Sequence, residues 1–162
     1  MSRVALLGAA AAAVAVMLSA CGDGLGSGGD DKKDEGPIVL GMLTPLSGSS
    51  AAIGPYMKNG AQLAIDEING AGGVDGRKLE LKVEDDACDA KNAAAGASKL
   101  VTAGVQISVG GYCSGATLPT LPIFENANIP MIIPAANSNE LVKQRKKNVF
   151  LINGTGAQQS DA

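Results

Sequence analysis

The chain has 162 residues, of which 46% are hydrophobic, and this is enough for one folded domain with its own core. The formal net charge is −3 and basic residues gather only at positions 143–147, which argues against a nucleic-acid partner. The sequence contains no histidine, so the commonest general base and the commonest metal ligand are both absent.

Residues 1–20 have the features of a secretory signal peptide. Arg3 supplies a short positive start, and the Ala-rich apolar stretch at residues 4–18 is shorter than a typical membrane-spanning helix. A buried helix of the mature fold is the alternative, but the Gly- and Asp-rich run that follows does not fit it. The stretch closes with "LSAC", which resembles the lipobox of bacterial lipoproteins, where the cysteine is acylated and becomes the mature N-terminus. We therefore expect Cys21 to carry a lipid.

The segment at residues 21–36 is predicted to be a flexible tether. After the cysteine it reads "GDGLGSGGDDKKDEG", which contains one hydrophobic residue and mixed charge. Such a composition cannot bury enough apolar surface to fold. Together with the lipid, it would hold the following domain near the outer face of the bacterial cell membrane.

The rest of the chain alternates between predicted strands and predicted helices. Runs typical of strands lie at residues 37–43, 79–83, 105–109, 129–133 and 149–152, and the second of these has a polar side that suits a sheet edge. Helices are predicted from Gly54-Pro55 onward and over residues 90–103. Strands that alternate with helices indicate an α/β fold: a parallel sheet with helices on both faces.

Three details of this pattern are also predictions. The core-facing side of the first helix should carry Met57, Ala61, Ala64, Ile65 and Ile68. Within residues 114–126, two prolines allow only a helix that begins near Pro119, or a kinked one. Residues 140–143 should form a short turn.

If Cys21 carries a lipid, two cysteines remain in the chain. Outside the cytoplasm, two such thiols are more often paired than free, which favours a disulfide between Cys88 and Cys113. However, "GYCSG" at residues 111–115 also matches the pattern of a hydrolase nucleophile elbow, with Cys113 in the nucleophile position. That mechanism needs a base, usually histidine, which this sequence lacks. A free structural cysteine is the third reading.

Ligands of open parallel sheets bind beyond the carboxyl ends of the strands. The loops expected there are residues 44–50, 85–86, 111–117, 134–138 and 154–155. Three of them are uncharged and rich in small polar residues, so their backbone N–H groups suit an anion such as a carboxylate.

Two polar features of these loops have alternative readings. Ser114 is either a ligand contact or a helix cap. Asp85 and Asp86 are turn residues beside a cysteine, Mg²⁺ ligands or part of a phospho-accepting site, and the predicted export and the absence of a companion motif favour the turn. No phosphate-binding lysine loop and no GxGxxG pattern is present. We therefore expect neither a metal nor a cofactor.

Several stretches resemble, in order and spacing, the N-terminal lobe of type I periplasmic binding proteins of the branched-chain amino acid (Leu/Ile/Val)-binding family, the receptors of ABC importers. They are "LSGSSAAIGPYMKNGAQLAIDEIN", "GGVDGRKLEL", "EDDACDAKNA", "GGYCSGATLP" and "IPMIIPAANSNEL". The resemblance implies an N-terminal lobe at residues 37–153 and the start of a hinge crossover at residues 154–162. The family's second lobe is missing from this incomplete fold, so we expect weak or undetectable ligand binding by these residues alone.

The resemblance also implies roles for individual residues. It implies that the two cysteines form a disulfide and that Ser114 binds the α-carboxylate of an amino acid ligand. The backbone of Ala135 and Asn137 would contact the ammonium and the carboxylate. Tyr112 and Ile53 would line the pocket for the ligand's side chain. Asn137 stands where the family usually has a hydroxyl residue, which leaves the preferred ligand open.

The function implied is that of a solute receptor that captures an amino acid, in the first place a branched-chain one, outside the membrane. It would deliver this ligand to the membrane subunits of an ABC permease by closure of a hinge. The alternatives are a receptor for an amide or urea, a sensory ectodomain for a signalling partner and, as the contrasting class, a cysteine hydrolase.

Overall fold

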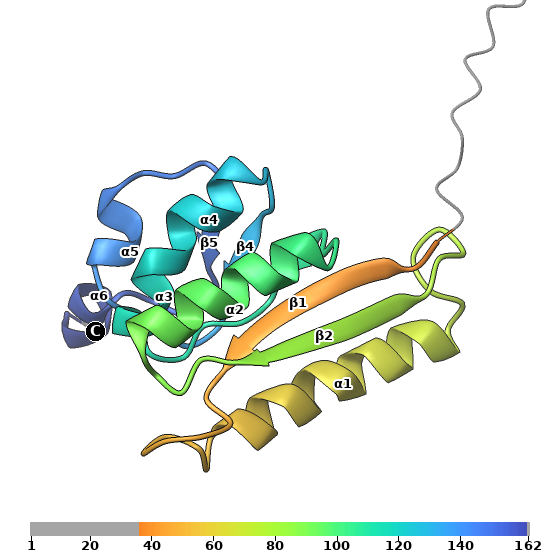
Figure 1. Ribbon diagram of the computed structural model, residues 1–162, viewed down its shortest axis with the longest axis horizontal. Coiled ribbons are helices and arrows are strands. Elements are labelled where there is room, and N and C mark those ends of the chain that lie inside the picture. Colours follow the sequence, from red (N-terminus) through yellow and green to blue (C-terminus); the bar gives the residue numbers. More distant parts are fainter. Residues whose placement is uncertain (1–35, 162) are drawn as a thin grey trace, which may run out of the picture. The chain divides into compact units, whose positions relative to one another are not determined.

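The computed structural model describes residues 36–161, which form a five-stranded sheet with helices on both faces (Figure 1). The predicted signal peptide, Cys21 and nearly all of the predicted tether lie outside the described residues. The strands are β1 (Ile38–Thr44), β2 (Leu79–Asp85), β3 (Ile107–Ser108), β4 (Met131–Ile133) and β5 (Val149–Leu151). None of the helices in residues 36–161 combines the length and the apolar character needed to cross a membrane.

All strand pairs are parallel, as predicted, and the order across the sheet is β2-β1-β3-β4-β5. The expected edge position of the second strand is confirmed. From β1 the chain crosses to one side to form β2, and it then crosses back over β1 to form β3. Because such crossovers share one hand, their helices lie on opposite faces. Figure 1 shows α1 (Gly54–Gly70) on one face of β1 and β2, with α2 (Ala90–Thr102) on the other.

The core has two parts, one on each face of the sheet. The larger packs α2 and the helices after β3 against the sheet, with Leu100, Phe124 and Met131 among its buried residues. The smaller joins Ile65 of α1 to Leu40 and Leu79 of the two strands beneath it. The sheet therefore has a thick side and a thin side.

Some residues of α1 that were predicted to face the core are exposed, because α1 lies on the thin side of the sheet. Ile65 is 3% exposed, and Met57 and Ala61 are half-buried, but Ala64 is exposed and Ile68 is 38% exposed. The helix covers β1 and β2 at one edge of the sheet, so only a narrow stripe of its surface finds a partner.

The segment with two prolines begins earlier than a start at Pro119, and it takes the kinked form. It comprises α3 (Ser114–Thr117), a 3₁₀ turn η1 (Leu118–Thr120) and α4 (Leu121–Asn126). Each proline falls in the first turn of its piece, where its missing N–H is not needed. The turn expected at residues 140–143 is one turn of helix, α5 (Glu140–Lys143). A further helix, α6 (Gly156–Ser160), was not expected.

Gly110 provides a test of how closely β1 approaches the loop after β3. A methyl group added there would lie 2.5 Å from both the nitrogen and the oxygen of Leu43, whose backbone cannot move without disturbing β1. We expect Gly110→Ala to lower the free energy of unfolding by about 2 kcal/mol, measured by urea denaturation. Gly115→Ala is the matched control, because open space surrounds that position. Equal unfolding midpoints for the two variants would contradict this packing.

Candidate functional site

The carboxyl ends of all five strands meet at one edge of the sheet, because every pairing is parallel. The chain leaves β1 toward β2 on one side, whereas β3 to β5 lie on the other side. The loops that follow β1 and β3 therefore flank the point at which the strand order reverses. This is the position where open α/β sheets bind their ligands.

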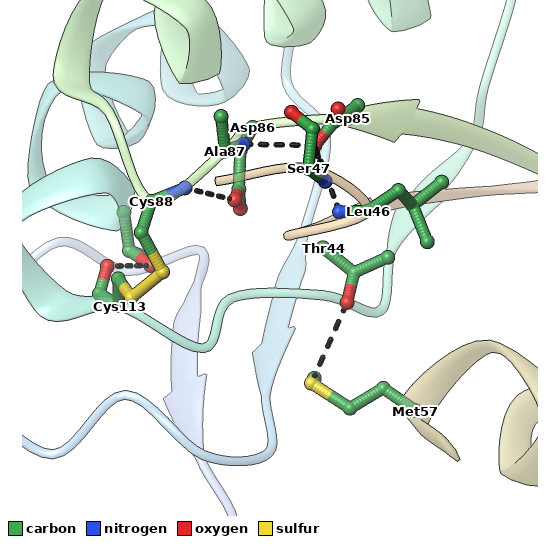
Figure 2. Close-up of a disulfide and its surroundings, with 10 residues drawn as sticks. Thr44, Leu46, Ser47, Met57, Asp85, Asp86, Ala87, Cys88 and Cys113 are labelled. Carbon is green, nitrogen blue, oxygen red and sulfur yellow. Dashed lines mark hydrogen bonds between the residues drawn. A yellow bond between two sulfur atoms is a disulfide. The ribbon is translucent and has the colours of Figure 1, made fainter. Parts of the chain in front are cut away.

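Asp85 joins the loop after β1 to the loop after β2 (Figure 2). Its carboxylate accepts hydrogen bonds from the backbone N–H groups of Leu46 at 2.8 Å, Ser47 at 3.2 Å and Ala87 at 2.9 Å. The pKa of Asp85 is lowered below its ordinary value, most strongly by a hydrogen bond from the side chain of Ser47 and further by these N–H groups. Desolvation acts in the opposite direction but does not cancel these effects. Asp85 is therefore a charged clamp between two loops.

Asp86 has the opposite environment, although it is the next residue. It is 1% exposed and its carboxylate accepts from the Cys88 N–H at 2.9 Å. It also lines a narrow interior gap with no room for a water molecule. Desolvation raises the pKa of Asp86, the Cys88 N–H opposes this, and the charge of Asp85 adds to it. Both carboxylates thus act as turn residues. Within residues 36–161, no group of three or more Asp, Glu, Cys or His side chains is placed to hold a metal.

A disulfide links Cys88, in the turn after β2, to Cys113, directly before α3 (Figure 2). The two Cα atoms are 5.3 Å apart and 25 residues separate the cysteines in sequence. A bridge around a loop of this size contributes about 3 kcal/mol in the chain-entropy account. The predicted pairing is confirmed, and the sulfur of Cys113 is engaged, so the elbow reading is wrong for this chain.

Ser114 connects the loop after β3 to the loop after β4. It is the first residue of α3, whose N-cap is Cys113, and the reading of Ser114 as a helix cap is wrong. Its Oγ instead accepts hydrogen bonds from the backbone N–H groups of Asn137 at 3.2 Å and Ser138 at 3.1 Å. A hydroxyl has two lone pairs and one proton. With both lone pairs engaged, the proton is available for donation to another group.

The loop after β4 is held from both sides. Toward β3, the N–H of Ala136 donates to the carbonyl of Gly111 at 3.0 Å. Toward β5, the side-chain Nδ2 of Asn153 donates to the carbonyl of Ala135 at 2.9 Å, and the N–H of Gly156 donates to the carbonyl of Asn137 at 2.7 Å. Ala136 is buried, whereas Ala135 and Asn137 are half-buried. The backbone of this loop is therefore fixed before any ligand arrives.

The side chain of Asn137 is bound by Gln159, for which the sequence pattern predicts no role. Its Nδ2 donates to Oε1 of Gln159 in α6 at 2.9 Å, and Nε2 of Gln159 donates to the carbonyl of Gly154 at 3.1 Å. Asn153 was missed as well. The available signal was its position directly after the last predicted strand, at the same sheet edge as the other loops.

Tyr112 and Ile53 are both half-buried, and they come from different loops. Tyr112 lies two residues before Ser114. Ile53 is the N-cap of α1, and its carbonyl accepts from the N–H groups of Tyr56 at 3.1 Å and Met57 at 3.2 Å. The structure thus brings Ser114 together with residues 135–137. In the described part of the chain, no hydrogen bond joins Ile53 or Tyr112 to that group.

The fold and this edge define a class: one α/β lobe whose N–H-rich loops meet at the reversal of strand order. The sequence profile of the family described as periplasmic binding protein matches residues 37–162. The chain belongs to this family, whose name places its members outside the cytoplasmic membrane.

Two relatives show how far the likeness extends. The Leu/Ile/Val-binding protein BraC3 of Rhizobium johnstonii is 37% identical over 124 residues, which cover 76% of this chain and 34% of the relative. The leucine-, isoleucine-, valine-, threonine- and alanine-binding protein of Pseudomonas aeruginosa is 41% identical over 113 residues, 70% of this chain and 30% of the relative. The chain therefore spans about a third of the length of these relatives.

Solved structures show the same fold. The branched-chain amino acid transporter substrate-binding protein LivJ of Streptococcus pneumoniae, in complex with isoleucine, has a TM-score of 0.69 and 34% identity over 74% of this chain and 34% of its own. A solute-binding protein of an ABC transporter from Rhodopseudomonas palustris, in complex with 3,4-dihydroxybenzoic acid, has a TM-score of 0.67 and 26% identity over 75% of this chain and 33% of its own.

The two neighbouring carboxylates should respond to pH in opposite ways. Asp86→Asn removes a charge that is poorly solvated only in the folded state, so this variant should be more stable than the wild type at neutral pH. Its advantage should disappear as the pH falls through the raised folded pKa to below 3.8, the ordinary value, where the wild-type carboxyl is protonated in both states.

Asp85→Asn is the matched comparison. Because the folded state favours the charged form of Asp85, its stabilisation is present above pH 3.8 and is lost as the pH falls through the lowered folded pKa. This variant should be less stable than the wild type at neutral pH and equal to it in acid. Urea denaturation across the pH range measures both differences, and the same sign for the two variants would refute the assignment.

Proposed function

We propose that this chain is the amino-acid-binding lobe of a solute receptor that serves an ABC importer. The observation that carries the proposal is the Ser114 hydroxyl, whose Oγ accepts two backbone N–H groups from the loop after β4 and so retains its proton for a ligand. The two relatives, a Leu/Ile/Val-binding protein and a leucine-, isoleucine-, valine-, threonine- and alanine-binding protein, support the same class of ligand.

The ligand's carboxylate would sit at the Ser114 hydroxyl and would share the N–H group of Asn137, which also donates to Ser114 Oγ at 3.2 Å. Both are hydrogen-bond donors at the carboxyl end of the sheet, and hydrogen bonds to a charged acceptor are about twice as strong as neutral ones. Preorganisation favours binding, because the loop after β4 is already fixed and loses little conformational freedom.

The ammonium would be accepted by the carbonyl of Ala135, and the apolar side chain would lie against Tyr112 and Ile53. These assignments follow the resemblance of "IPMIIPAANSNEL" and "GGYCSGATLP" to the family's ligand loops. The Leu/Ile/Val-binding relatives favour an aliphatic ligand, hence a branched-chain amino acid. Bond-making chemistry is not proposed, because the sequence has no histidine and the sulfur of Cys113 is in a disulfide.

A receptor for an amide or urea is the second candidate, and one observation favours it. Asn137 would offer its side-chain amide to the ligand. Oε1 of Gln159 accepts one of the two N–H groups of that amide at 2.9 Å. The remaining N–H and the oxygen of Asn137 form a donor and acceptor pair, which matches a primary amide.

Outside the described residues, the proposal includes export and lipid anchoring at Cys21, with residues 1–20 removed. The partners are then the membrane subunits of an ABC permease, reached from the outer face of the bacterial cell membrane. Residues 154–162 would begin the crossover to a second lobe, and closure of the two lobes would drive the population shift.

Ser114→Ala should weaken binding of L-leucine by about tenfold or more, because it removes a hydrogen bond to a charged group. Amide chemical shifts of residues 112–117 and 135–138, followed by NMR at millimolar L-leucine, provide the measurement and detect weak binding. Ser98→Ala is the matched control: its hydroxyl bonds only to the carbonyl of Ala94 on the exposed side of α2.

Leucinol, which lacks the carboxylate, should not shift these signals in the wild type. If leucinol binds as tightly as L-leucine, or if Ser114→Ala binds like the wild type, the carboxylate assignment fails. If a primary amide binds more tightly than L-leucine, the amide receptor replaces the amino acid receptor.

Cys21→Ser should release the exported protein from the membrane fraction, because no acyl chain can then be attached. Metabolic labelling with a palmitate analogue in a bacterial host is the measurement, and the wild type should be labelled and sediment with membranes. Cys88→Ser is the control that removes a different cysteine. Equal labelling of wild type and Cys21→Ser would disprove the anchor.

A further inference from the structure

Two asparagines hold β5 to the segments on either side of β4, one at each end of the strand. Nδ2 of Asn148 donates to the carbonyl of Ile129, just before β4, at 2.9 Å. Nδ2 of Asn153 donates to the carbonyl of Ala135, just after β4, at 2.9 Å. In both side chains Oδ1 is buried and has no hydrogen-bond partner in the described part of the chain. The two 2.9 Å contacts are of the same kind, although Nδ2 of Asn153 also reaches the carbonyl of Ala136 at 3.5 Å, and only Asn153 lies at the ligand edge.

The contact made by Asn153 completes the support of one peptide group. The Ala135–Ala136 peptide is planar, with its carbonyl on Ala135 and its N–H on Ala136. The N–H donates to the carbonyl of Gly111 at 3.0 Å and the carbonyl accepts from Asn153. A planar group held at both ends cannot rotate, so Asn153 fixes the direction of the Ala135 carbonyl.

This arrangement leaves the carbonyl able to accept a second hydrogen bond. A carbonyl oxygen has two lone pairs, and Asn153 uses one of them. The side chain of Asn153 is a neutral donor, so it does not repel a cation as lysine or arginine would at the same place. Ala135 itself is half-buried rather than enclosed.

We propose that Asn153 is a positioning residue that holds the Ala135 carbonyl ready for a ligand ammonium and so selects an amino acid over a plain carboxylate. This inference rests on the proposed function. The Ser114 side of the site binds the carboxylate, which both kinds of ligand possess. The Ala135 side binds the ammonium, which only the amino acid possesses. Asn153 acts mainly on the second side, because its bond to the Ala135 carbonyl at 2.9 Å is much shorter than its 3.5 Å contact with the Ala136 carbonyl, whose peptide carries the Asn137 N–H.

The experiment compares two variants with two ligands. Asn153→Leu removes the donor at similar size, and Asn148→Leu removes the matched donor at the other end of β5. L-Leucine and isocaproate, the same molecule without its amino group, are titrated against the wild-type chain and both variants by NMR. Asn153→Leu should lose affinity for L-leucine by roughly tenfold and keep its affinity for isocaproate. Asn148→Leu should change neither.

A readout without ligand accompanies the titrations. In Asn153→Leu the carbonyl-carbon signal of Ala135 should move upfield as its hydrogen bond is lost, and in Asn148→Leu it should stay in place. Asn153→Ser, too short to reach the carbonyl, gives the same comparison if the leucine variant does not fold.

Each other outcome has a distinct meaning. If Asn153→Leu and Asn153→Ser lose both ligands equally, the residue only maintains the fold and the inference is overturned. An unmoved Ala135 carbonyl signal overturns it as well. If the wild type binds isocaproate but not L-leucine, the ammonium assignment and the inference fail while the carboxylate site stands. The titrations reach millimolar ligand, where the weak binding expected of a single lobe is detected, so a wild type that binds neither L-leucine nor isocaproate there overturns the proposed function and the inference with it.

Discussion

The hydroxyl of Ser114 lies between two loops that are distant in sequence, and the candidate site depends on that one contact. Its oxygen receives N–H groups of Asn137 and Ser138, which belong to the loop after β4, while its backbone begins α3 after β3. If the two loops separated, the N–H groups and the hydroxyl would no longer converge. Strands β3 and β4 are neighbours in the sheet, so their carboxyl ends start close together and a short side chain can span them.

The sheet itself could be predicted because the sequence pattern is redundant. Five apolar runs separated by helical segments admit few arrangements other than a parallel sheet, and parallel pairing places every strand's carboxyl end at one edge. The loop containing Ser114 and the loop at residues 134–138 were therefore expected at the same edge from order alone. The disulfide followed from cysteine count and compartment, and the structure confirms it.

Other features could not be predicted, because they depend on contacts that no local pattern records. The exposure of Ala64 and Ile68 depends on how many strands α1 covers, and helical periodicity carries no information about that. Asn153 and Gln159 are polar residues after the last strand, where a surface loop would also have them. Asn153 donates to the carbonyl of Ala135, and Gln159 accepts from the amide of Asn137. Both contacts form only in the folded chain.

The two halves of the proposed site, one for a carboxylate at Ser114 and one for an ammonium at Ala135, differ in how firmly they are built. The carboxylate side includes the disulfide at Cys113, which contributes about 3 kcal/mol. Through Cys88 this disulfide connects it to the loops that Asp85 joins by hydrogen bonds. On the proposed ammonium side, the peptide that carries the Ala135 carbonyl is held by two neutral hydrogen bonds, one from Asn153 to that carbonyl and one from the Ala136 N–H to Gly111, each worth about 1 kcal/mol. Under the role proposed for Asn153, a substitution there would remove one of these two bonds and alter the ammonium side at little expense to the fold, whereas the carboxylate side would resist change. On this account, a family built on this lobe can exchange amino acids for other carboxylates more easily than it can abandon carboxylates.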